Sequence, residues 1–144
     1  MAISFQVTFD CADPDGLAHF WAAALGYQIQ APPEGFETWI DWLKAHGIPE
    51  DQWNSASAIV DPDGQATRIF FQRVPEGKSV KNRVHLDVNV GGGLDASPDQ
   101  RRGRVAAAVD HLVSLGATRL DEMDERGEHW VVMQDPEGNE FCLQ

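Results

Sequence analysis

Basic residues are scarce in this sequence. Eleven lysines and arginines stand against 23 aspartates and glutamates, which gives a formal net charge of −12. Such a field repels phosphate backbones and anionic lipid surfaces, so we expect neither nucleic acid nor a membrane as partner. No apolar run approaches the roughly 20 residues of a membrane span, and the first residues lack the pattern of a secretory signal. We therefore expect a cytoplasmic protein.

Cysteine is also scarce. Cys11 and Cys142 are the only two, and both fall in strand-like segments. A pair of this kind, without a secretory signal, indicates reduced thiols buried in a core rather than a disulfide framework. With 42% hydrophobic residues in 144, the chain has enough apolar material for one globular domain, residues 1–144.

The most informative feature that is present is an internal repeat. The turn DPDG at residues 61–64 and the turn DPEG at residues 135–138 each lead into an apolar segment. Each turn closes a half that opens with a strand and continues with a helix ending in Leu-Gly. The pattern predicts an α+β fold of two βαβββ modules, residues 1–74 and 82–144. We expect curled mixed sheets around a shared cleft, with the helices outside.

The first half carries an insertion, residues 36–53, that has no counterpart in the second. Apolar spacing predicts a helix over 36–46, and Trp39, Trp42 and Trp53 lie in or beside it. Three tryptophans cannot all point outward without exposing a large apolar patch. They pack on the sheet, line a pocket or form a homodimer contact, and we expect at least one, with Trp39 as the candidate, to bind the ligand.

Strand alternation predicts which side chains face the cleft. Opening strands are expected over residues 5–11 and 82–90, with Phe5 and Val84 on the helix side, and Val131 of a closing strand is expected to face a helix as well. The cleft side then carries six side chains, namely Gln6, Thr8, His85, Asp87, Trp130 and Glu140. A flat apolar ring beside polar groups is typical of a site for a small apolar or aromatic molecule.

Three segments carry a resemblance to a known family: residues 7–14 (VTFDCADP), residues 82–88 (NRVHLDV) and residues 130–143 (WVVMQDPEGNEFCL). With them the chain resembles the vicinal oxygen chelate superfamily, which includes glyoxalase I, extradiol dioxygenases, fosfomycin-resistance enzymes and bleomycin-binding proteins. The resemblance implies a metal ligand from the opening and closing strand of each module. The matching positions hold Gln6, Gln72, His85 and Cys142, with Glu140 as the alternative to Cys142. Since no carboxylate falls at the expected positions, no metal cofactor is favoured, although a divalent ion remains the alternative.

Two functions follow from this resemblance. The first is binding of a small apolar or aromatic molecule without a tightly held metal, through Gln6, Thr8, Gln72, Asp87, Trp130 and Trp39. The second is a divalent-metal-dependent lyase, isomerase or dioxygenase. His85 is a candidate catalytic base or a pocket hydrogen-bonding residue, and Asp87 could orient it. Glu140 is either a catalytic carboxylate of raised pKa or a structural group bound to backbone near the second turn.

Overall fold

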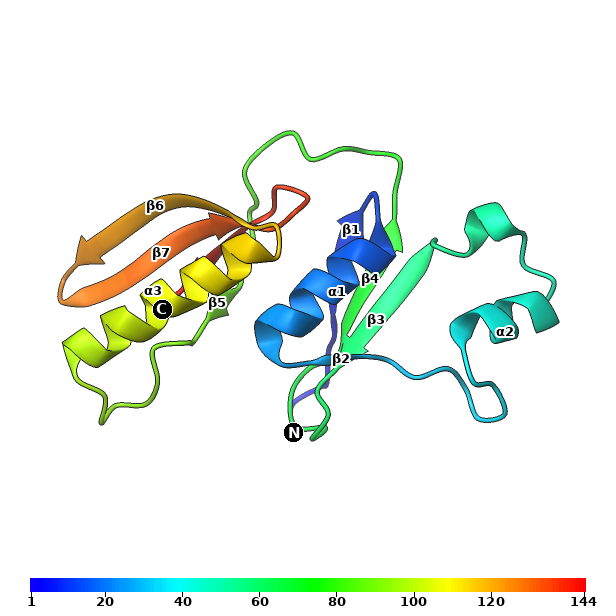
Figure 1. Cartoon of the computed structure of the whole chain (residues 1–144), viewed down its shortest axis with the longest axis horizontal. Coiled ribbons are helices and arrows are strands. Elements are labelled where there is room, and N and C mark those ends of the chain that lie inside the picture. Colours follow the sequence, from blue (N-terminus) through cyan, green and yellow to red (C-terminus); the bar gives the residue numbers. More distant parts are fainter. The chain divides into compact units, whose positions relative to one another are not determined.

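The computed structural model describes all 144 residues, and they divide into two compact units, Met1–Gly77 and Lys78–Gln144. Unit 1 contains β1 (Val7–Cys11), α1 (Pro14–Leu25), β2 (Gln28–Ile29), α2 (Trp39–Ala45), the 3-10 turn η1 (Glu50–Gln52), β3 (Ala56–Val60) and β4 (Ile69–Arg73) (Figure 1). Unit 2 contains β5 (Asp87–Val88), α3 (Pro98–Ser114), β6 (Thr118–Glu125), β7 (Glu128–Gln134) and β8 (Glu140–Leu143). The predicted α+β class and the two βαβββ modules are confirmed. None of the helices combines the length and the apolar character that crossing a bilayer requires.

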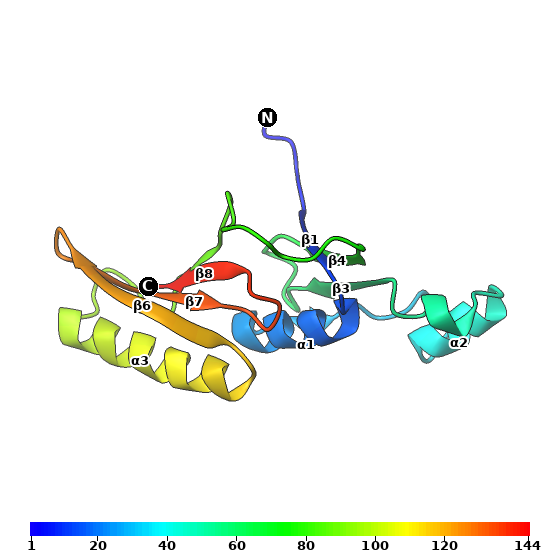
Figure 2. The ribbon, with the colours of Figure 1, turned by 90° about the horizontal axis from the view of Figure 1, so that it is seen from above.

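In unit 1 the sheet has the strand order β1-β4-β3-β2, with β1 parallel to β4 and the other pairs antiparallel. Helix α1 begins where the Asp13 side chain accepts a hydrogen bond from the Gly16 N–H, 3.1 Å away. It packs on one face of the sheet (Figure 2), and Trp21 and Phe71 are both fully buried there. The opposite face of this sheet carries no such helix, so its side chains are available for other contacts.

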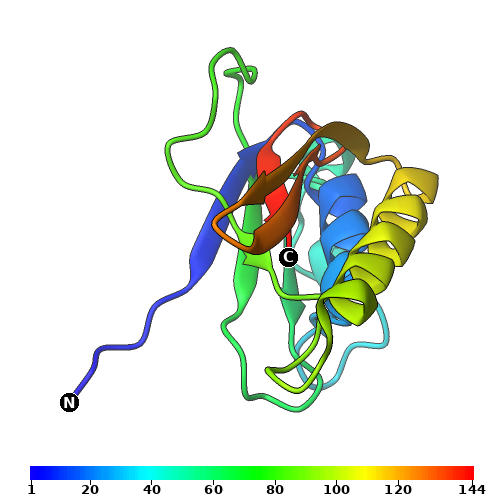
Figure 3. The same cartoon turned by 90° about the vertical axis from the view of Figure 1, so that its left-hand side faces the viewer.

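Unit 2 repeats the plan with the strand order β5-β8-β7-β6, in which β5 is parallel to β8. Ser97 and Gln100 form a reciprocal capping box that begins α3. The helix runs along one face of the sheet (Figures 2 and 3), and the buried side chains beneath it include Val131, Met133 and Phe141. Odd-numbered positions of β7 therefore face the helix, and even-numbered positions face the other way.

The two opening strands are shorter than the alternation predicts, which corrects the ranges 5–11 and 82–90. Strand β1 begins at Val7, and Phe5 is 75% exposed. Strand β5 contains only two residues, and Val84 is 82% exposed. The backbone N–H of Asn82 binds the side chain of Glu140 instead of a neighbouring strand, at 3.0 Å. Because these segments do not pair, Phe5 and Val84 do not face a helix as expected.

The two repeated turns share one hydrogen-bond pattern. The Asp61 carboxylate accepts from the backbone N–H groups of Asp63, Gln65 and Ala66. The Asp135 carboxylate accepts from the backbone of Glu137 and Asn139 and from the Asn139 amide. Gly64 and Gly138, with φ of 67° and 85°, adopt the left-handed conformation that glycine tolerates best. Each turn thereby directs the chain into the strand that closes its sheet.

Candidate functional site

The open face of the unit 1 sheet and the insertion together enclose a pocket of about 630 Å³. Helix α2 supplies one wall, and β3 with the start of β4 supplies the other. Figure 1 shows α2 standing beyond the edge of the sheet rather than packed onto it, and none of its residues is buried. The apolar lining is formed chiefly by Trp39, Trp42, Leu43, Ile48, Trp53 and Phe70. The pocket is thus a largely apolar, aromatic-walled cavity.

Two of the three tryptophans are fixed by hydrogen bonds from their indole N–H groups. The indole N–H of Trp39 donates to the backbone carbonyl of Gln30 at 2.7 Å, and that of Trp53 donates to the carbonyl of Ile48 at 2.9 Å. With both N–H groups bound to the protein, the rings are fixed and their faces stay free for apolar contact. The rings of Trp39 and Trp42 meet edge to face, with centroids 5.8 Å apart. All three tryptophans of the insertion line this pocket.

One cation lies in this wall. Arg68 donates from Nε to the Gln30 side chain and from Nη1 to the Gln6 side chain, each at 2.7 Å. Its guanidinium carbon lies 5.3 Å from the centroid of the Phe70 ring, within reach of a cation–π contact. Gln6 therefore reaches the pocket by positioning Arg68. Sequence reasoning did not select Arg68, although it lies two residues before Phe70 and a strand directs such residues to the same face.

Two other predicted site residues lie on the open face of the same sheet. Thr8 is paired in register with Phe70, and Gln72 is paired with Asp10. The Gln72 amide donates to the Asp10 carboxylate at 2.7 Å. The side-chain amide of Gln72 is therefore bound to a residue of the neighbouring strand β1.

In unit 2 the predicted residues gather in one hollow of about 410 Å³. It lies on the sheet face opposite α3. The side chains that line it include His85, Asp87, Trp130, Glu140 and Cys142. Trp130 reaches it because the even-numbered positions of β7 face away from the helix.

Three metal-ligating side chains meet in this hollow. One ligand atom each from His85, Asp87 and Cys142 falls within a cluster no wider than 4.8 Å. His85 Nε2 lies 3.3 Å from a carboxylate oxygen of Asp87. Burial raises the pKa of the Cys142 thiol, and the negative charge of Asp87 raises it further. The resting thiol is therefore protonated at neutral pH.

The donor set of this cluster fits a borderline-soft divalent ion. Zinc takes imidazole, carboxylate and thiolate ligands, and three protein ligands leave one position open for water or substrate. A thiolate ligand disfavours hard ions such as Mg²⁺. An ion would have to displace the thiol proton, so its binding would weaken as the pH falls. In this set Asp87 would be the carboxylate ligand, and Cys142 rather than its alternative Glu140 would be the ligand from β8.

Glu140 is held by the backbone of its own unit. Its carboxylate accepts from the Asn82 N–H at 3.0 Å and lies 3.2 Å from the Lys78 ammonium. The Asn82 hydrogen bond lowers the pKa of Glu140, and Lys78 adds to the effect. A catalytic acid needs the opposite shift, so this geometry agrees with the structural alternative for Glu140. Asn82 and Lys78 are far from Glu140 in sequence, which is why sequence patterns did not reveal them.

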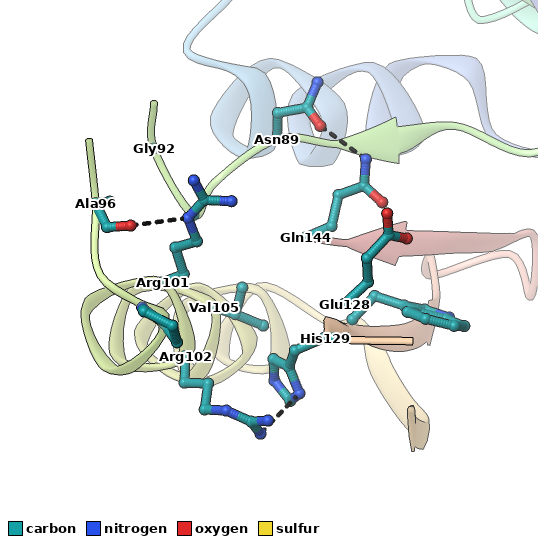
Figure 4. Close-up of a pocket in the computed structure, with 13 residues that line it drawn as sticks. Asn89, Gly92, Ala96, Arg101, Arg102, Val105, Glu128, His129 and Gln144 are labelled. Carbon is teal, nitrogen blue, oxygen red and sulfur yellow. Dashed lines mark hydrogen bonds between the residues drawn. The ribbon is translucent and has the colours of Figure 1, made fainter. Parts of the chain in front are cut away.

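A further hollow of about 480 Å³ lies in unit 2 between the first half of α3 and β7 (Figure 4). Arg101 donates to the backbone carbonyls of Ala96 and Gly93, so it connects the loop that precedes α3 with the first turn of this helix. Arg102 is paired with Asp124 and also reaches His129. The cations of this hollow are thus already bound within the fold, and we assign it a structural role.

Comparison with known proteins identifies the fold family. The sequence pattern of the glyoxalase-like domain matches residues 6–144. No curated protein sequence matches the chain.

Solved structures of similar fold agree. A hypothetical protein from S. aureus is 14% identical with a TM-score of 0.64, over 99% of this chain and 93% of that one. A glyoxalase/bleomycin resistance protein/dioxygenase family enzyme from Burkholderia phytofirmans PsJN is 16% identical with a TM-score of 0.61, over 96% and 94%. The fosfomycin resistance protein FosX from Listeria monocytogenes is 10% identical with a TM-score of 0.63, over 100% and 90%.

The repeated modules, the matched residues and these folds lead to one conclusion. The chain belongs to the glyoxalase-like domain family.

Proposed function

We propose that this protein binds a flat, apolar or aromatic small molecule in the tryptophan-lined pocket of unit 1, and that this binding requires no metal. The observation that carries the proposal is the pocket itself. Its volume of about 630 Å³ lies within the range of small-molecule sites, and its walls are aromatic with a few convergent polar groups. Trp39 lines it directly and Gln6 positions the arginine in its wall.

The insertion supports a role in recognition. The second module lacks it, so the βαβββ plan does not require it, and additions to a scaffold often carry function. Helix α2 buries none of its residues, and its Trp39 is 37% exposed. A ligand between α2 and the sheet would remove this apolar surface from water, which is the main favourable term in such binding.

The test uses 2-naphthol, a neutral flat aromatic, measured by equilibrium dialysis. Removing one indole face forfeits about 60 Å² of apolar contact, or about 1.5 kcal/mol, so Trp39→Ala and Trp53→Ala should each weaken binding about tenfold. Trp130→Ala, in the hollow of unit 2, is the matched control and should leave binding unchanged. Circular dichroism of each variant checks that it folds. Loss of binding in Trp130→Ala alone, or no binding by the unaltered protein, would overturn the proposal.

A second function is favoured by the His85, Asp87 and Cys142 cluster. We propose as the alternative that these three side chains bind a divalent ion such as zinc, which would supply a Lewis acid for lyase, isomerase or dioxygenase chemistry. FosX from Listeria monocytogenes, whose fold is similar, was solved with Mn(II) and a dihydroxypropylphosphonic acid. Here the thiol and imidazole favour zinc over manganese.

Cobalt(II) titration tests this alternative, because a thiolate ligand produces a sulfur-to-cobalt absorption band. We expect the band in the unaltered protein and in Cys11→Ser, and its loss in Cys142→Ser. Titration calorimetry with zinc on the same variants gives the affinity. If cobalt produces no band and zinc binds no more tightly than to His85→Ala, the metal-dependent function is refuted.

A further inference from the structure

Arg68 carries a charge that no acid in the protein neutralises. None of the ion pairs in the structure includes it. Its two side-chain partners, Gln6 and Gln30, are neutral amides. Arg102 in unit 2 is paired with Asp124, whereas Arg73, Arg101 and Arg104 donate to backbone carbonyls. Arg68 is half-buried and its side chain donates only to two neutral amide side chains, so its charge lies unpaired in the wall of the pocket.

The position of Arg68 indicates what would neutralise it. The guanidinium lies over the Phe70 ring, and both residues line the aromatic pocket. Nε and Nη1 donate to the two glutamines, and Nη2 has no protein partner. The two amides therefore fix the plane of the group and leave Nη2 free to donate. A guanidinium N–H held in this way can donate a charge-assisted hydrogen bond to a carboxylate oxygen.

We infer that the ligand of this pocket is an aromatic or apolar carboxylate, with its ring between the tryptophans and its carboxylate on Arg68. This inference rests on the proposed function, because it names the charge of the molecule that the same pocket binds. A single cation balances a monoanion. A phosphate dianion would leave one of its two charges without a partner.

The experiment compares two nearly isosteric probes, 2-naphthoate and 2-naphthamide, at pH 7 by titration calorimetry. Both have the same ring and differ in charge. We expect the unaltered protein to bind naphthoate at least about tenfold more tightly than naphthamide, the effect of a charge-assisted hydrogen bond. Arg68→Gln should abolish this preference and leave the naphthamide affinity within about twofold, which also shows that the pocket is intact.

Two further variants keep the test decisive if Arg68→Gln does not fold. Gln30→Glu places a carboxylate beside the guanidinium, so it should also remove the preference for naphthoate. Arg102→Gln, the matched loss of an arginine in unit 2, should leave both affinities unchanged. A phenylphosphonate arm tests the dianion, which we expect to bind more weakly than benzoate.

The possible failures are distinguishable. If naphthamide and naphthoate bind equally well and both depend on Trp39, the carboxylate inference is wrong and the proposed function stands. If phenylphosphonate binds more tightly than benzoate through Arg68, the ligand class is a phosphonate or phosphate, which overturns the inference. If neither naphthalene probe binds, the proposed function and this inference fail together.

Discussion

Replacing Asp135 by alanine should be among the most damaging single changes in unit 2. The residue is 2% exposed, and its carboxylate accepts hydrogen bonds from both backbone and side-chain donors. They come from the Glu137 N–H at 2.9 Å, the Asn139 N–H at 3.0 Å and the Asn139 amide at 2.9 Å. These bonds shape the turn between β7 and β8, the two strands that present Trp130 and Cys142 to the hollow.

The expected loss can be worked from these contacts. A hydrogen bond to a charged acceptor contributes about 1.5–3 kcal/mol. When the acceptor is removed, new hydrogen bonds between water and the exposed donors restore part of this free energy. We therefore expect Asp135→Ala to lower the free energy of unfolding by about 3–4 kcal/mol. With a urea slope of about 2 kcal/mol per molar, the midpoint should fall by roughly 1.5–2 M. Far-UV circular dichroism follows the transition, and hydrogen exchange over residues 128–144 localises the change.

Asp61→Ala provides the matched control, because Asp61 makes the same kind of turn in unit 1 with three backbone N–H donors. That turn is exposed, so water can replace the lost acceptor and the midpoint should fall by clearly less. Equal shifts in the two alanine variants would refute the reasoning that burial makes the second turn the more costly one to break.

Three further outcomes are expected. Asp87→Asn should speed alkylation of Cys142 by iodoacetamide at pH 8, because removing the negative charge lowers the raised pKa of the thiol. Peptide mass spectrometry measures the rate. An unchanged rate would contradict an electrostatic effect of Asp87 on the Cys142 thiol. In Glu140→Gln the free energy of unfolding should fall less steeply as the pH is lowered. The pKa of Glu140 is lowered by the Asn82 N–H, so its contribution is present above the unfolded-state pKa and is lost as the pH falls through the folded-state value; urea melts from pH 3 to 7 would show it. Thr38→Ala removes the N-terminal cap of α2, so it should lower the local stability of this helix by about 1 kcal/mol and raise the rate of hydrogen exchange over residues 39–45. Thr38→Ser keeps the hydroxyl and should exchange at nearly the original rate.

Local patterns predicted much of the fold. Alternation correctly placed Val131 on the helix side of its strand, where it is 3% exposed, and the repeated turns gave the two modules. Alternation failed for Val84 because it assumes that a strand-like segment finds a neighbour to pair with. The backbone at Asn82 binds a side chain instead, and β5 therefore contains only two residues.

The candidate sites were predictable only where their parts lie on one strand or one insertion. The density of tryptophans in the insertion, and the spacing of His85 and Asp87 in one segment, indicated candidate site residues from the sequence. The sequence did not indicate Arg68, because its partners Gln6 and Gln30 lie 62 and 38 residues away along the chain. Its unpaired charge is visible only when the sheet brings these residues together.

The parallel strand pairs of the two units carry different chemistry. One in-register pair in unit 1 is Asp10 with Gln72, and one in unit 2 is Asp87 with Cys142. Each carboxylate has a hydrogen-bond donor opposite it, an amide in the first case and a thiol in the second. An amide N–H does not ionise at any accessible pH, whereas a thiol can give up its proton to a metal ion. The donor that can ionise therefore lies in the second unit, while the first unit holds a fixed cation in an aromatic wall.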